Sequence, residues 1–162
     1  MVETVLAERI QAVLDCETGR IVGRLTKDVD LLEGIKEVCR NNKLEAAQFQ
    51  CMGSLLHATY VQLEESDQGV LRYSPKVKSD TAVELLSGTG FVGIDQDGEL
   101  DVHFHGLFVD CNQKITGGHF IHGENPVAVT VEFILFPLPK VKMQRGNDEV
   151  YGLPVFQFSK KE

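Results

Sequence analysis

The chain has 162 residues, of which 43% are hydrophobic. This is enough to bury a core within one globular domain without disulfides or a second domain, so we expect residues 1–162 to form a single domain. The formal net charge at pH 7 is −8. Such a charge disfavours nucleic acid as a partner, because binding to phosphates depends on lysine and arginine displacing counterions.

The four cysteines are scattered along the chain and form no C-x-x-C spacing, which excludes a zinc knuckle and a thioredoxin-like redox motif. This usage is typical of reduced thiols inside a cell. The first residues lack the basic region and apolar run of a signal peptide, and no apolar stretch approaches the length that spans a membrane. We therefore expect a soluble cytoplasmic protein without membrane association.

The first forty residues contain one ambiguous segment and one clear helix. Residues 2–14 carry apolar side chains at positions that fit a helical stripe, and residues 21–25 predict a short strand. Asp28 or Asp30 is suited to cap a helix whose apolar side chains recur at helical spacing until Asn41-Asn42 stops it. This is the principal helix that the sequence predicts.

The middle of the chain predicts strands rather than helices. Alternating or β-prone side chains predict strands over residues 47–51, 55–63, 70–73 and 82–86. Gly53-Ser54 bends the chain between the first two of these, and the polar stretch 64–80 is a surface excursion. The small-residue run 87–90 predicts a kinked strand, because it lacks the Lys-Ser/Thr pair of a phosphate-binding loop.

The stretch from Asp101 to His122 carries four of the five histidines. Its two β-prone runs flank the turn-forming residues 110–113 and predict an antiparallel hairpin. If the loop is 111–113, residues whose numbers sum to 224 lie opposite each other. His105 then faces His119.

Three of these histidines share one face of the predicted hairpin. Side chains alternate along a strand, so His103 and His105 point the same way, and His119 joins them with its Cβ about 4.5–5.5 Å from that of His105. Phe104 lies on the opposite face. Three imidazoles beside an open position form the pattern of a catalytic zinc site, so we predict that His103, His105 and His119 bind zinc.

Two details of this hairpin leave alternatives open. Gly117-Gly118 fits a bulge, which would shift the register by one residue, or a close approach of the backbone to a bound ligand. His122 falls on the aromatic side of the register and is left out of the metal site. The roles of His57, Arg24 and Glu84 also stay open, and each is most simply explained as a structural or solvent-facing residue.

The last third of the chain contains the most apolar strand, residues 127–136, with Glu132 as its one carboxylate. A buried charge needs a partner or a proton. Glu132 is therefore either half of a structural salt bridge or a catalytic acid-base that serves the metal. Residues 137–150 are predicted to form a mobile basic loop, and residues 153–158 a closing strand.

Several motifs resemble the PPC domain, the "plants and prokaryotes conserved" module. They are HFH, then GGHF about a dozen residues later, then VAVTVEFIL, preceded by GRIVGRLTKDVDLLEGIKEVCRNNKLEAAQFQCMGSL. The resemblance covers about 130 residues. It implies an α+β fold, a mixed and largely antiparallel β-sheet sandwich with one principal helix, similar to that of acetolactate decarboxylase, and it implies a strand within residues 2–14.

The resemblance also implies a homotrimer and a zinc ion held by His103, His105 and His119. The function that we favour is a zinc-binding assembly module with a regulatory or ligand-sensing role and a small-molecule ligand at the metal. The alternative is a zinc-dependent lyase or hydrolase that acts on a small carbonyl or ester, because an open position on zinc activates water or a carbonyl. DNA binding, the role given to similar proteins, is disfavoured by the acidic charge and by the absence of an Arg-Gly-Arg-Pro hook.

Overall fold

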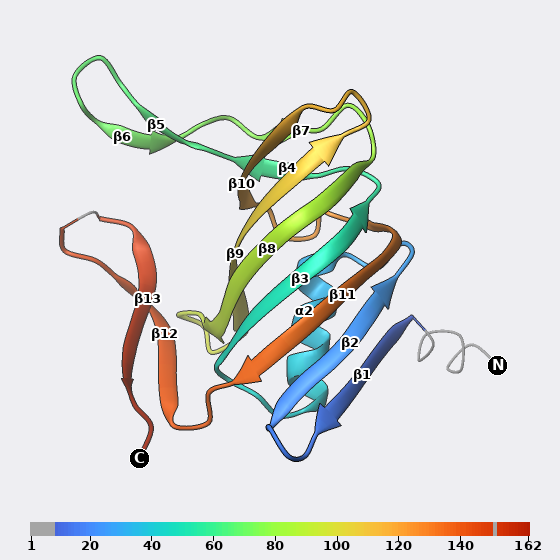
Figure 1. Ribbon diagram of the computed structural model, residues 1–162. Coiled ribbons are helices and arrows are strands. Elements are labelled where there is room, and N and C mark those ends of the chain that lie inside the picture. The colour runs from blue at the N-terminus through green and yellow to red at the C-terminus, as the bar shows by residue number, and fades with distance from the viewer. Residues whose placement is uncertain (1–8, 151) are drawn as a thin grey trace.

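The computed structural model of the chain describes residues 9–150 and 152–162. This part forms thirteen strands and one helix, which carry the same labels here as in Figure 1. The helix is α2 (Leu31–Asn41). The strands are β1 (Ile10–Asp15), β2 (Arg20–Thr26), β3 (Ala47–Leu55), β4 (Thr59–Val61), β5 (Leu63–Glu65), β6 (Leu71–Tyr73), β7 (Val77–Lys78), β8 (Val83–Ile94), β9 (Leu100–Asp110), β10 (Ile115–Phe120), β11 (Val127–Pro137), β12 (Val141–Asn147) and β13 (Pro154–Lys160).

Eleven of the strands belong to one sheet. Nine follow the order β1-β2-β11-β3-β8-β9-β10-β4-β7, and the β12–β13 hairpin joins the end of β8. All pairings are antiparallel except the short contact of β12 with β8. β5 and β6 form a separate hairpin, and Figure 1 shows it projecting on the same side of the molecule as β12–β13. The predicted α+β class, with a largely antiparallel sheet and one principal helix, is confirmed.

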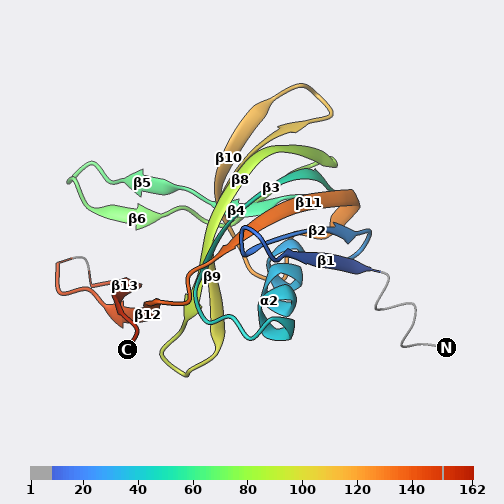
Figure 2. The ribbon, with the colours of Figure 1, turned by 60° about the horizontal axis from the view of Figure 1, so that its bottom comes forward.

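Helix α2 packs against one face of the sheet, which curves over it in Figure 2. The Asp30 carboxylate caps the helix by accepting hydrogen bonds from the backbone N–H groups of Leu32 and Glu33, as the sequence predicted. The apolar stripe of α2 is buried against the sheet and consists of Leu31, Leu32, Ile35, Val38 and Cys39. The other face of the sheet has no helix over it in the described residues, and it carries His103, His105 and His119.

Aromatic rings fill the core under β8. Phe49 and Phe104 stack with their ring centroids 5.5 Å apart. Gly88 and Gly90 of β8 make room for these rings, because a Cβ at either position would collide with them. The run 87–90 is therefore part of the strand β8, and its irregularity is a bulge between Leu85 and Ser87.

Several sequence-based boundaries need correction. Residues 137–150 do not form a loop, because 141–147 pair with 154–160 as a hairpin. The predicted strand 55–63 is interrupted, and His57 lies in the connection between β3 and β4 rather than in a strand. The strand expected within residues 2–14 is present as β1, and residues 1–8 lie outside the described part. Within that part, no helix has both the length and the apolar character that a membrane span requires.

Candidate metal centre

The β9–β10 hairpin has the predicted register. Ile115 lies opposite Val109 and His119 lies opposite His105, so the numbers of paired residues sum to 224. No bulge occurs at Gly117-Gly118, which pair in step with Leu107 and Gly106. The absence of a side chain at Gly117 instead allows close approach to the backbone of β9.

This register brings His103, His105 and His119 together on the sheet face opposite α2. One nitrogen of each imidazole lies within 4.8 Å of one nitrogen of the other two. The Nε2 atoms of His103 and His105 are 3.1 Å apart. The ring centroid of His119 lies 5.1 Å from the ring centroid of His103 and 5.4 Å from that of His105. These are the three histidines that the sequence predicted to share one face of the hairpin, and their role as zinc ligands remains a prediction.

The three side chains fit a metal ion. The Nδ1 atom of His119 is buried and has no hydrogen-bond partner in the described residues, although a buried polar atom normally has one. Nitrogens that bind one zinc at about 2.0–2.1 Å lie roughly 3.3 Å from one another. The Nε2 atoms of His103 and His105 already have a similar spacing of 3.1 Å. An ion held by three imidazoles would keep a coordination position open.

Electrostatics also favours metal binding over protonation. Burial, followed by the charges of His103, His105 and Arg145, lowers the pKa of His119 from 6.5 to about 4. Burial and the charges of His105 and Arg145 also lower the pKa of His103, against a smaller opposing effect of Asp101. Both rings are thus neutral at pH 7, and the neutral imidazole is the form that binds metals.

A network of charged side chains lies beside the cluster. Asp101 accepts a hydrogen bond from Arg145 Nε at 2.6 Å through Oδ2, and its Oδ1 lies 3.2 Å from His122 Nε2. Burial alone would raise the pKa of Asp101, but the hydrogen bonds and charges of His122 and Arg145 hold it well below its usual range. The Asp101 bond raises the pKa of His122 in turn. His122 thus belongs to this charged network and is not a member of the cluster.

Glu132 does not have the environment that the sequence predicted. It is exposed rather than buried, and it lies opposite Arg24 of β2 and Met52 of β3. No ion pair joins Glu132 to Arg24 within the described part of the chain. Glu132 lines a cavity that shares no residue with the one beside His103 and His119. Its assignment as a catalytic acid-base remains a prediction.

The residues whose roles the sequence left open, Arg24, His57 and Glu84, also lie outside the histidine cluster. Glu84 is exposed on β8. Burial, then the charge of Lys78, lowers the pKa of His57.

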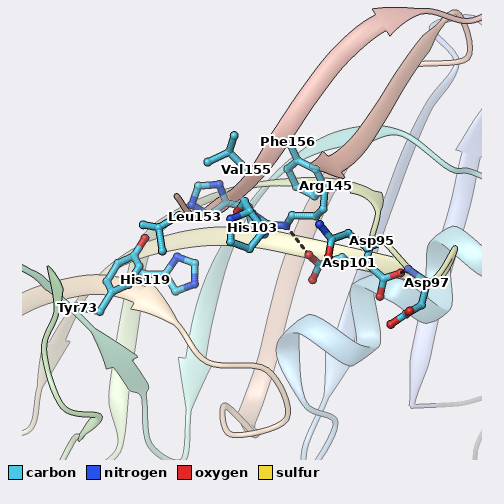
Figure 3. A pocket seen from close by; sticks show the side chains of 12 residues that line it. Tyr73, Asp95, Asp97, Asp101, His103, His119, Arg145, Leu153, Val155 and Phe156 are labelled. Atoms are coloured by element: carbon cyan, nitrogen blue, oxygen red, sulfur yellow. Dashed lines mark hydrogen bonds and ion pairs between the residues drawn. The ribbon is translucent and has the colours of Figure 1, made fainter. Parts of the chain in front are cut away.

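Two residues that lie beside the cluster were not predicted from the sequence to belong to the site. Tyr73 of β6 stands with its ring centroid 5.7 Å from that of His119, and Arg145 of β12 lies near His103 (Figure 3). The alternation of Val141, Met143 and Arg145 could have indicated a strand, but the prolines and basic residues favoured a loop. Nothing local in the sequence connects either residue with the histidines.

Residues 16–139 match the sequence profile of the Plants and Prokaryotes Conserved (PCC) domain, also written PPC. The chain belongs to this family. The matched part runs from before β2 to the end of β11 and includes all three histidines, whereas β12 and β13 lie beyond it. None of the curated proteins compared with this PCC-domain chain matches it.

Solved structures share the fold over nearly the whole chain. A plant- and prokaryote-conserved protein from Pyrococcus horikoshii is 24% identical, with 91% of this chain and 94% of that chain covered and a TM-score of 0.72. A metal-containing protein from Archaeoglobus fulgidus is 24% identical, with 91% and 99% covered and a TM-score of 0.73. A candidate DNA-binding protein from Bacteroides thetaiotaomicron is 11% identical, with 93% and 98% covered and a TM-score of 0.76.

Proposed function

We propose that this PCC-domain protein binds one zinc ion per chain through His103, His105 and His119, and that it binds a small molecule at the metal in a regulatory or ligand-sensing role in the cytoplasm. The observation that carries the proposal is the convergence of three imidazole nitrogens, one from each histidine, within 4.8 Å of one another. The similar metal-containing protein from Archaeoglobus fulgidus supports it. Zinc would supply a Lewis acid with an open position for a ligand.

Elemental analysis tests the metal. We expect close to one zinc per chain in the wild type, and loss of most of it in His103→Ala and His119→Ala, because each change removes one of three ligands. His57→Ala is the matched control, since it removes a histidine outside the cluster. Undiminished zinc in both cluster variants would contradict the proposal.

We also propose a homotrimer, for which the exposed sheet face gives support. Met52, Leu86 and Leu107 lie on the neighbouring strands β3, β8 and β9, and each is roughly half exposed on the face opposite α2. Contiguous exposed apolar side chains mark interaction surfaces. Light scattering should give three times the chain mass, and Met52→Glu should reduce it. The mass of a single chain for the wild type would contradict this assembly.

The alternative function is a zinc-dependent lyase or hydrolase for a small carbonyl or ester. It is favoured by a cavity of about 530 Å³ that His103 and His119 line, because this gives a substrate access to the metal position. If Glu132 handles protons, Glu132→Gln should retain zinc and lower turnover by about 10²–10⁴-fold. Turnover that is unchanged in this variant would remove Glu132 from the mechanism.

A further inference from the structure

The open cavity beside the histidines is lined in part by residues of two hairpins, β5–β6 and β12–β13, which come from distant parts of the chain. Its walls include Tyr73 from β6, His103 and His119 from the sheet, and Arg145, Leu153 and Phe156 from the β12–β13 hairpin (Figure 3). The last three residues lie beyond residue 139, where the match to the PCC domain ends. This chain therefore builds one wall of the cavity from a segment outside the matched domain.

Arg145 is a fixed cation in this wall. Its side chain is 17% exposed, its Nε donates to Asp101 at 2.6 Å, and its Nη1 donates to the carbonyl of Pro154 at 3.2 Å. The guanidinium lies over the ring of Phe156, with 4.2 Å from Cζ to the ring centroid. These contacts hold the planar group in place before any ligand arrives.

Arg145 also has N–H groups that make no hydrogen bond in the described residues. An arginine carries five N–H groups. Within the described part of the chain, Arg145 engages one on Nε and one on Nη1. A mostly buried cation with remaining donors favours an acceptor in the adjoining cavity, and a carboxylate matches the guanidinium fork in geometry and charge.

The charges around the cavity favour a singly charged anion. The Arg145 guanidinium lies near His103 and His119, and its positive charge disfavours a metal ion there. An anion that lies between the metal ion and Arg145 removes this cost. Asp95, Asp97 and Asp101 also line the cavity. Their negative charges penalise a doubly charged phosphate more than a carboxylate.

The remaining wall is apolar. Leu153, Val155 and Phe156 line the cavity on the same hairpin as Arg145, and Tyr73 of β6 also lines it. A volume of about 530 Å³ suits a small organic molecule. An apolar group would lie against these side chains.

We propose that this cavity binds a small organic carboxylate, with the carboxylate on Arg145 and an apolar group against the β12–β13 hairpin. The inference deepens the proposed function and rests on it, since it names the class of molecule that occupies the site beside the metal. Arg145 is the residue that selects for charge, and Asp101 and Phe156 position it.

Isothermal titration with phenylacetate and phenylacetamide tests the proposal, because the two probes share size and shape and differ in charge. We expect the wild type to bind phenylacetate at least tenfold more tightly than the amide. Arg145→Gln should abolish this preference and retain the zinc content of the wild type. Arg72→Gln, which alters an exposed arginine on β6, is the control and should retain the preference.

Zinc content is measured on the same samples, so a failure of the zinc-site proposal can be distinguished from a failure of the carboxylate proposal. If zinc is present and the wild type binds acid and amide equally, or binds neither, the carboxylate proposal is wrong and the metal site stands. If zinc is absent, the metal proposal is wrong, and the acid and amide comparison still decides the role of Arg145. If Arg145→Gln does not fold, the wild-type comparison decides alone. Tighter binding of inorganic phosphate than of phenylacetate would also overturn the proposal.

Discussion

The Asp101 carboxylate offers a direct test of how the site is supported, through Asp101→Asn. This change preserves the shape of the side chain and removes the negative charge between Arg145 and His122. The Arg145 guanidinium would then be left without its counter-charge while its side chain remains 17% exposed. The variant should therefore be less stable than the wild type.

The exposed fractions of the Asp101 and Arg145 side chains determine how much stability Asp101→Asn should lose. Breaking a fully buried ion pair from one side costs roughly 3–5 kcal/mol, whereas an exposed pair contributes about 1 kcal/mol or less. The Asp101 side chain is 23% exposed and that of Arg145 is 17% exposed, so the pair lies nearer the buried limit. We expect a loss of about 2–3 kcal/mol, which lowers the Tm of a chain of this size by roughly 4–12 °C.

Thermal unfolding at pH 7 measures the effect. Glu99→Gln is the matched control, because it removes the same charge from an exposed side chain two residues away. The double variant Asp101→Asn/Arg145→Met should regain part of the lost stability, since it no longer buries an unpaired cation. A Tm for Asp101→Asn within about 1 °C of the control would refute the reasoning, because even 1 kcal/mol shifts Tm by more than this.

Three further predictions concern pH, packing and nucleic acid. The pKa of His122 is raised above 6.5 in the folded chain, so its charged bond to Asp101 stabilises the fold below pH 6.5 and is lost as pH rises through the raised pKa. The Tm difference between wild type and His122→Gln should accordingly be larger at pH 6 than at pH 9, and an equal difference would contradict this. Gly88→Ala should cost roughly 1–3 kcal/mol in unfolding free energy, measured by urea denaturation, because the added Cβ collides with the ring of Phe104; wild-type stability would show that the ring yields freely. With a net charge of −8, the chain should not bind duplex DNA at submicromolar concentration in about 150 mM salt, and tight binding with a steep salt dependence in a filter assay would overturn this expectation.

The convergence of the three histidines was predictable because local rules determine it. A tight turn fixes the register of a hairpin, and alternation then decides which side chains share a face. His103, His105 and His119 lie within one such hairpin, so no long-range information was needed. The helix start at Asp30 was predictable for the same reason.

Long-range packing explains what the sequence did not reveal. Arg145 reaches the site through the pairing of β12 with β13 and through Asp101, which is 44 residues away. Glu132 was expected to be buried because β11 is apolar on both faces. However, α2 covers only one face of the sheet, and Glu132 is exposed on the other. The small-residue run 87–90 predicted a kinked strand, but the sequence could not show why Gly88 is small: the ring of Phe104 from the neighbouring strand β9 fills the space of its side chain.

The position of β11 in the sheet has a consequence for how the chain folds. β11 pairs with β2 on one side and β3 on the other, so it joins the N-terminal hairpin to the rest of the sheet. On the ribosome, β2 and β3 therefore both have an open edge until residue 137 has emerged, whereas the β9–β10 hairpin closes earlier through local contacts. Sheet completion must await late and distant pairing, which is slow. A chain cut before Val127 should lack cooperative unfolding altogether rather than form a smaller version of the domain.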